Sequence, residues 1–184
     1  IQNWTTENGL AGDKVRVCIE DKNGNLWVGT TTGLSIIYPD GNIKNYFRAD
    51  GLNNDYIMCL YEDSKGDIWV GTDGGGINII SNEDIIKSYT TNENGLAGNV
   101  IFKIFEDENG IFWIPTGTGI SRFDGEKFFN YDTSNGLGVD SVFQLLIDYT
   151  HTVWMTSNKG ISTVSLGDMN ALANGEIEAI DPKF

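Results

Sequence analysis

Short apolar runs alternate with polar, glycine-bearing turns along almost the whole chain. The runs are rich in Val, Ile, Phe, Trp and Tyr, and runs of this kind bounded by turn residues are typical of β-strands. Helical spacing is clear only over 168–173, where Asp168 is a candidate N-cap and Gly175 a stop signal. The pattern therefore predicts an all-β fold with one short helix near the C-terminus.

One phrase recurs at a nearly constant interval: an apolar run ending in an acidic residue, a turn, and a second run with a tryptophan inside it. The tryptophans are Trp27, Trp69, Trp113 and Trp154, at spacings of 42, 44 and 41 residues. Gly-Leu pairs at 9–10, 51–52, 95–96 and 136–137 keep the same three spacings. Two independent markers in one register establish a repeat of ~40–45 residues.

Each unit contains four short strands and one tryptophan, which is typical of a β-propeller blade. The predicted blades span 13–47, 55–90, 99–132 and 140–180, and residues 1–4 are predicted to be an outer strand of a preceding or closing blade. The four tryptophans are expected to fill the wedge between neighbouring sheets. A sugar-stacking platform is the weaker hypothesis for them, because all four lie inside apolar strands.

The number of blades leaves two arrangements open. Residues 177–180 (IEAI) offer the last blade its fourth strand, which favours a segment of a larger propeller. Alternatively, residues 1–4 complete the last blade and close a four-bladed ring. In the first arrangement apolar blade faces are open at both ends, so we expect self-association that completes a larger ring.

Composition narrows the classes of function. The 184 residues include 12 Lys and Arg against 26 Asp and Glu, a net charge of −14, which argues against nucleic acids and anionic membranes as partners. The segment has neither an apolar run long enough to span a membrane nor a signal-peptide pattern. Cys18 and Cys59 are too few for a disulfide framework and are predicted to be small core residues, with a disulfide between blades as the other option.

Catalytic chemistry finds little support. His151, the single histidine, falls at a turn position, and no motif places a base beside a Ser or Cys nucleophile. The Glu-Asp pairs at 20–21, 62–63 and 106–107 repeat at strand ends, which indicates a structural role rather than a glycosidase pair. We therefore predict no catalytic residue, no metal site and no cofactor.

A binding site is expected on the loops. In a four-stranded meander the loop entering the first strand shares a face with the loop after the tryptophan strand, and Asn, Asp and Thr gather there. Loop residues that do not repeat between blades are candidates for a small polar ligand: Asn53, Asn54, Asp73, Thr31, Thr32, Asn158 and Lys159. Arg16 and Lys103, in first strands that line the central channel, join them. The repeating Asp13, Asp55, Asn99 and Asp140 are predicted to hold turns, and turn formation is the alternative for the whole set.

The segments VRVCIEDKNGNLWVGTTTGLS (from Val15) and YIMCLYEDSKGDIWVGTDGGGIN (from Tyr56) resemble the two-component regulator propeller repeat. The third unit departs from it at Ile114-Pro115, where glycine is expected second. The fourth departs at Met155 and lacks the Glu-Asp pair and the turn glycine. The resemblance implies a ligand-sensing module on the periplasmic or extracellular side of a membrane-bound histidine kinase or diguanylate cyclase, with oligosaccharides as candidate ligands. A protein-interaction scaffold and a polysaccharide-active enzyme are the alternatives.

Overall fold

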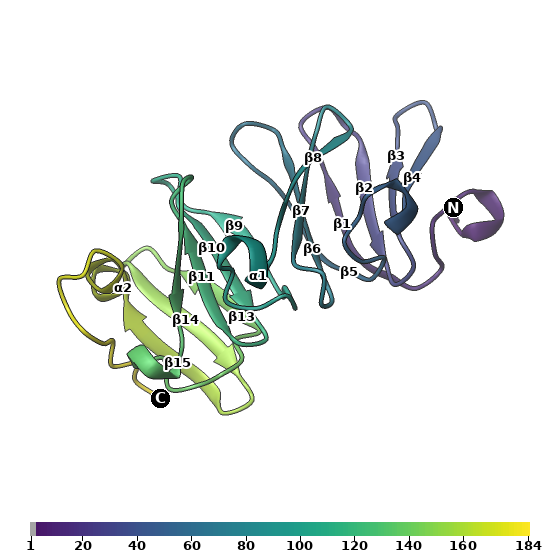
Figure 1. Cartoon of the computed structure of the whole chain (residues 1–184). Coiled ribbons are helices and arrows are strands. Elements are labelled where there is room, and N and C mark those ends of the chain that lie inside the picture. Colours follow the sequence, from purple (N-terminus) through teal and green to yellow (C-terminus); the bar gives the residue numbers. More distant parts are fainter. Residues whose placement is uncertain (1–2) are drawn as a thin grey trace.

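The computed structural model describes residues 3–184 and contains four antiparallel sheets that follow one another along the chain (Figure 1). Blade 1 contains β1 (Val15–Glu20), β2 (Leu26–Thr30), β3 (Leu34–Ile37) and β4 (Ile43–Tyr46). Blade 2 contains β5 (Ile57–Glu62), β6 (Ile68–Thr72), β7 (Ile77–Ser81) and β8 (Asp84–Tyr89). Blade 3 contains β9 (Phe105–Glu106), β10 (Phe112–Thr116), β11 (Gly119–Phe123) and β12 (Phe128–Tyr131). Blade 4 contains β13 (Gln144–Ile147), β14 (Thr152–Ser157) and β15 (Gly160–Ser165). Within each sheet consecutive strands are neighbours, which confirms the predicted propeller fold.

A short helical turn that the sequence pattern did not predict precedes each blade. These turns are η1 (Thr6–Asn8), η2 (Arg48–Asp50), α1 (Thr91–Asn94) and η3 (Thr133–Asn135). Each ends at the glycine of a Gly-Leu pair, which is left-handed in all four copies, with φ of 113° at Gly9 and 77° at Gly95. Glycine adopts this conformation without the steric cost that other residues meet. The leucine that follows is buried, so the pair ends a helical turn and anchors the chain in the core.

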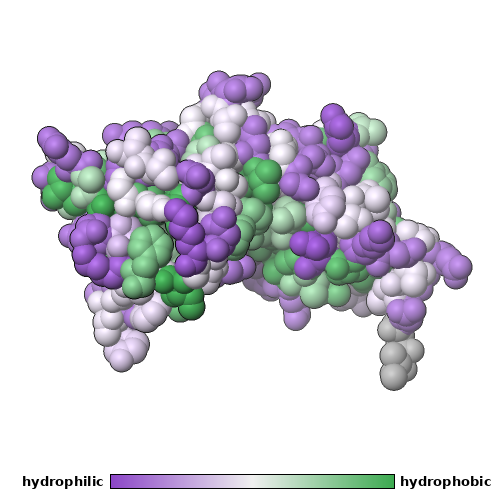
Figure 2. Space-filling model, turned by 90° about the horizontal axis from the view of Figure 1, so that it is seen from below, coloured by the Kyte–Doolittle hydropathy of each residue, from purple (hydrophilic) through white to green (hydrophobic). Residues whose placement is uncertain are grey.

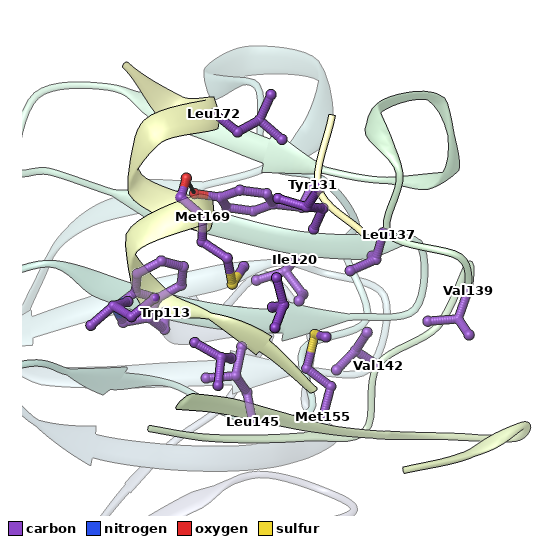
Figure 3. Packing of buried hydrophobic residues seen from close by; sticks show 14 residues of the cluster. Trp113, Ile120, Tyr131, Leu137, Val139, Val142, Leu145, Met155, Met169 and Leu172 are labelled. Carbon is purple, nitrogen blue, oxygen red and sulfur yellow. Dashed lines mark hydrogen bonds between the residues drawn. The ribbon is translucent and has the colours of Figure 1, made fainter. Parts of the chain in front are cut away.

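The tryptophans fill the spaces between neighbouring blades. Trp27 clusters with apolar residues of blade 2, and the Trp69 ring stacks on Phe112 of blade 3 with centroids 4.1 Å apart. Trp113 is fully buried among residues of blades 3 and 4 (Figure 3). Trp154 differs, since its side chain is 42% exposed. Within residues 3–184 no blade lies against the Trp154 face, so its predicted wedge role stays a prediction.

Each indole is also held by a carboxylate six residues earlier. The Nε1–H groups donate to Oδ2 of Asp21, Asp63, Asp107 and Asp148 over 2.8, 2.9, 2.8 and 2.7 Å. The other oxygen of each carboxylate accepts backbone N–H groups of the intervening hairpin turn. The acidic residue after the first strand is thus structural, as its repetition predicted.

Blade 3 has a shorter first strand than the pattern predicted. β9 pairs with β10 only at Phe105 and Glu106, and Ile101 rejoins the sheet as an isolated bridge to Thr116. Pro115 lies where blades 1 and 2 have Gly29 and Gly71. Because proline has no N–H to donate to a ladder, regular pairing is interrupted at this point.

Blade 4 departs most from the prediction. Residues 177–180 form no strand, and Ile180 is instead buried in the core between blades 3 and 4. The place beside β15 is taken by Lys183, whose N–H and C=O bond to Thr163 over 2.7 and 2.8 Å. Lys183 thereby occupies the position that Lys44 has in blade 1, where it pairs with Ile36.

The predicted C-terminal helix is present as α2 (Leu166–Ala173) but begins two residues earlier than expected. Its N-cap is Ser165, whose hydroxyl accepts the N–H of Asp168 over 2.9 Å, so Asp168 lies in the first turn and is not the cap. The helix contacts blade 3, where the Tyr131 hydroxyl donates to the carbonyl of Met169 over 2.8 Å (Figure 3). This helix explains why the chain returns to the edge of β15 only at Lys183, as an isolated bridge and not a fourth strand.

The two ends of the described chain lie at opposite ends of the row of blades (Figure 1). The predicted strand 1–4 falls partly outside the described residues, and Asn3 and Trp4 lie in no strand. Trp4 packs beside Leu10 on blade 1. The alternative of a closed four-bladed ring is therefore wrong.

The two cysteines are both free thiols but differ in burial. Cys59 is buried, as predicted for a core residue, and its burial raises the pKa of its thiol to about 12. Cys18 is exposed, which contradicts the prediction. Its counterpart in blade 2 is Leu60, which blade 1 covers. Within residues 3–184 no blade covers Cys18 from the corresponding side.

Candidate ligand-binding site

A recurrent hydrogen bond ties together the loops on the predicted binding face. Thr32 Oγ1 donates to the carbonyl of Ala11 over 3.0 Å, and Thr118 Oγ1 makes the same bond to Ala97 over 2.7 Å. In blade 4 the ammonium of Lys159 takes this place and donates to the carbonyl of Gly138 over 3.1 Å. Thr32 and Lys159 therefore perform one repeated task, although their different residue types predicted non-repeating ligand candidates.

The two asparagines of blade 2 are also occupied by loop backbone. Asn53 Nδ2 donates to the carbonyl of Gly75 over 2.8 Å, and Asn54 Nδ2 donates to that of Asp73 over 2.6 Å. Asn53 in addition lines a hollow of about 360 Å³ together with polar side chains of the next loop, Ser88, Thr90, Asn92, Glu93 and Asn99. Of the predicted loop residues, Asn53 is thus placed on a cavity wall while its amide supports the loop.

Three of the four repeating acidic and amide residues hold the helical turns, whereas Asp140 is exposed and makes no such bond among residues 3–184. Asp13, Asp55 and Asn99 accept the first N–H of the turn before their own blade, over 2.7, 2.6 and 2.9 Å. This agrees with the turn role that their repetition predicted.

Three loop candidates remain, and the structure does not bring them together. Thr31 is half-buried in blade 1, Asp73 is exposed in blade 2, and Asn158 is exposed in the turn between β14 and β15. Because they belong to three different blades and line no common cavity among the described residues, the loop face offers no single site built from them.

A second region, which we call the channel-side pocket, brings Arg16 and Lys103 together. It has a volume of about 420 Å³ and lies along the first strands. It is lined by Arg16, Val17, Met58, Cys59, Leu60, Tyr61, Phe102, Lys103, Ile104, Phe105 and Gln144. Among residues 3–184 no carboxylate lines this pocket, although the chain has a net charge of −14.

Both cations are supported by aromatic rings. The Arg16 guanidinium carbon lies 5.7 Å from the centroid of Tyr56, and Lys103 Nζ lies 5.3 Å from that of Phe105. Lys103 also donates to the carbonyl of Leu145 over 3.0 Å, and its partial burial lowers the pKa of the ammonium. Arg16 is exposed. The pocket thus presents donors and positive charge beside apolar ring faces.

The aromatic residues and Gln144 of this pocket were missed from the sequence. Each first strand reads as a plain apolar run, and the burial of its residues depends on which neighbouring blade covers them. The usable signal was the presence of charged residues inside these runs, which did identify Arg16 and Lys103. Seen from below, hydrophobic residues interrupt the mostly hydrophilic surface in the middle of the molecule (Figure 2).

Two features are absent from the described residues: a cluster of metal ligands and a membrane-spanning helix. Within residues 3–184, no three His, Cys, Asp or Glu side chains lie close enough together to hold a metal ion. None of the helices in the same residues is both long and apolar enough to cross a bilayer.

Fold and pocket together define an open β-propeller segment with two cations, Arg16 and Lys103, beside its inner strands. Residues 9–32 and 51–74 match the family described as two component regulator propeller. These two matches lie in blades 1 and 2, and they confirm the resemblance seen in the first two units. A search of curated proteins gives no match.

Solved structures with the same fold include two from B. thetaiotaomicron. The extracellular domain of BT3049, described as a hybrid two component system, is 27% identical with a TM-score of 0.80, over 95% of this chain and 24% of that one. The extracellular domain of BT4673, described as a one component system, is 26% identical with a TM-score of 0.75, over 89% and 25%. This chain thus spans about a quarter of either relative.

A lyase shares the fold as well. Virginiamycin B lyase from Staphylococcus aureus is 20% identical with a TM-score of 0.66, over 92% of this chain and 55% of that one. At this level of identity the likeness concerns the fold alone.

Proposed function

We propose that this chain is part of the ligand-sensing domain of a bacterial two-component signalling protein, located on the periplasmic or extracellular side of the membrane. The repeats at 9–32 and 51–74 and the likeness to extracellular domains of signalling proteins support this proposal. The ligand is a small polar molecule, with oligosaccharides as the leading class. Binding would change the arrangement of propeller domains, and a separate histidine kinase or diguanylate cyclase domain would respond.

The channel-side pocket is the observation that carries this proposal. Its two cations and the Gln144 amide can donate to hydroxyl or carboxylate oxygens, while Tyr61 and Phe102 offer ring faces for the C–H side of a sugar. Because no carboxylate lines the pocket, ligands that carry an anionic group should bind more tightly than neutral ones of the same size.

A thermal-shift screen of neutral and uronic acid oligosaccharides tests the proposal. A ligand at 100 times its dissociation constant adds ~2.7 kcal/mol to the free energy of unfolding. For a chain of this size that corresponds to a rise in Tm of about 5–10 °C. The shift should shrink in Arg16→Ala and in Lys103→Met, which keeps the apolar stem of the side chain, and persist in the control Asp73→Ala on the loop face. Equal shifts in all three variants would rule out the channel-side pocket.

We further propose that this segment is not catalytic. His151 is the single histidine and lies in an exposed turn with φ of 59°. The one thiol of the pocket, Cys59, is buried and donates to the carbonyl of Ile101 over 3.8 Å, so it is not paired with a base. Release of product from any oligosaccharide in the screen, detected by chromatography, would contradict this.

Self-association through the open faces is part of the same proposal. Leu146, Trp154 and Ile161 of blade 4 are 58%, 42% and 59% exposed. At the other end, Val15 of blade 1 is 49% exposed, whereas its counterpart Ile57 is fully buried by blade 1. The exposed face of blade 4 resembles the faces of blades 1 to 3 that are covered by the next blade along the chain. The exposed face of blade 1 resembles the faces of blades 2 to 4 that are covered by the preceding blade. A second copy can therefore cover both by head-to-tail contact.

A further inference from the structure

A glutamate of one blade closes the gap to the hairpin turn of the blade before it. Glu62 of blade 2 accepts the N–H of Lys22 over 3.0 Å. Glu106 of blade 3 accepts the N–H of Ser64 over 2.7 Å and its hydroxyl over 2.8 Å. These bonds join the hairpins between the first and second strands of neighbouring blades. They lie at the end of the blades opposite the loops that carry Thr32 and Asn53.

Among the described residues, the interface between blades 3 and 4 lacks this bond. Ile147 precedes Asp148, at the position that Glu62 and Glu106 hold before Asp63 and Asp107. Glu108 stands where Lys22 and Ser64 stand, and its N–H has no acceptor among residues 3–184. A pocket of about 560 Å³ lies at this place.

The walls of this pocket differ in character. Phe105, Ile147 and Leu166 form its apolar part, and Leu166 is fixed there because its N–H donates to the carbonyl of His151 over 2.8 Å. Tyr149 also lines the pocket and is 96% exposed, so its ring is available to a ligand. The carboxylate of Glu108 faces no lysine or arginine, since none lines the pocket.

The Asp107 and Asp148 carboxylates of the same pocket are already occupied. Asp107 accepts the backbone N–H groups of Asn109 and Ile111 and the indole N–H of Trp113. Asp148 is held in the same way by the next hairpin and by Trp154. The groups free to meet a ligand are therefore the Glu108 N–H and carboxylate, the His151 side chain and the Tyr149 ring.

We propose that this pocket binds a neutral hydroxylated ring, of the size of one or two sugar residues. A hydroxyl oxygen would accept the Glu108 N–H, in the place of the glutamate oxygen found between the other blades, and its proton would go toward the Glu108 carboxylate. The C–H face of the ring would lie on Tyr149 and Ile147. Glu108 repels a carboxylate here, so this site selects against the anionic ligands that the channel-side pocket favours.

Titration calorimetry with neutral disaccharides (maltose, cellobiose and lactose) and a galacturonic acid disaccharide tests the inference. We expect saturable binding of at least one neutral disaccharide and weaker binding of the uronate. Tyr149→Ala should lower the affinity at least about tenfold. Because the Tyr149 side chain is exposed, its removal should not unfold the chain, so weaker binding would reflect loss of the ring itself. The double variant Glu108→Ser, Ile147→Glu reproduces the residues found between blades 2 and 3 and should abolish binding while it keeps Tm. Asp73→Ala on the loop face serves as the control and should leave the affinity unchanged, whereas Arg16→Ala reports whether a disaccharide binds at the channel-side pocket.

Three results would overturn the inference. The first is no saturable response to any neutral disaccharide at about 10 mM, a concentration that detects millimolar dissociation constants. The second is unchanged affinity in both Tyr149→Ala and the double variant. The third is loss of binding only in Arg16→Ala, which would assign the ligand to the channel-side pocket and leave the proposed sensor function standing.

Discussion

Trp113 and Trp154 allow a matched test of how the blades are held together. Both indoles lie in a second strand and donate to an aspartate, over 2.8 and 2.7 Å. Trp113 is fully buried between blades 3 and 4, whereas Trp154 is 42% exposed. The two residues thus share their local hydrogen bond and differ in whether a following blade covers the ring.

The expected cost of replacement follows from this burial. A buried tryptophan removes ~150–250 Å² from water, which at ~25 cal/mol per Å² stabilises the folded chain by about 4–6 kcal/mol. Trp113→Ala should therefore lower the free energy of unfolding by about 3–5 kcal/mol, the usual range for such truncations. Trp154→Ala releases only part of that area and leaves no cavity, so we expect at least about 2 kcal/mol less destabilisation.

Urea and thermal unfolding of the two variants measure this difference, at a protein concentration where light scattering shows monomers. A gap of about 2 kcal/mol corresponds to about 4–8 °C in Tm for a chain of this length. Equal destabilisation by the two substitutions would refute the argument, because it would mean that the shared hydrogen bond, and not the contact between blades, stabilises the fold.

Three further outcomes are expected. Burial disfavours the charged form of Asp21, but hydrogen bonds from the indole and the turn outweigh this effect and hold the pKa of Asp21 below its ordinary value. The contribution of Asp21 to stability should therefore be complete above about pH 5 and lost as the pH falls below about 4. In unfolding curves measured against pH, Asp21→Asn should reduce this loss of stability at acid pH. Trp154→Ala and Leu146→Lys should each weaken concentration-dependent self-association in sedimentation velocity, and unchanged association would contradict the use of this face. Gly76→Ala should destabilise the chain more than Gly95→Ala, since both have positive φ but only at Gly76 would the added carbon meet a backbone carbonyl; equal losses of Tm would contradict this.

Repetition made the fold predictable from the sequence. The tryptophan and Gly-Leu markers report local tasks, filling a wedge and ending a helical turn, that each blade needs in the same form. A residue that repeats therefore identifies its own role, as Asp21 and its counterparts show by holding the indoles. What repetition could not predict is the covering of a residue by another blade, and this is why Trp154 and Cys18 were expected in the core.

The same reasoning failed at the loops for a physical reason. Thr32 and Lys159 differ in chemistry, yet both donate to the same loop carbonyl, so a difference in residue type did not mean a difference in task. The outer strand of blade 4 failed similarly. Ile177 to Ile180 have the composition of a strand, but the position of α2 puts Ile180 in the core and brings Lys183 to the sheet.

A departure from the repeat is most informative when it removes a bond that the other blades make. Pro115 changes only the length of a strand, because the chain rejoins the sheet at Ile101. Ile147 instead removes the carboxylate that joins neighbouring hairpins. The Glu108 N–H, which has no acceptor among residues 3–184, and the pocket occur at the same place. If the double variant Glu108→Ser, Ile147→Glu raises the free energy of unfolding and still binds the disaccharide, packing alone explains the isoleucine at position 147. If the double variant removes binding at constant Tm, the broken repeat marks a site, and the positions worth testing in other blades are those where a cross-blade bond is missing.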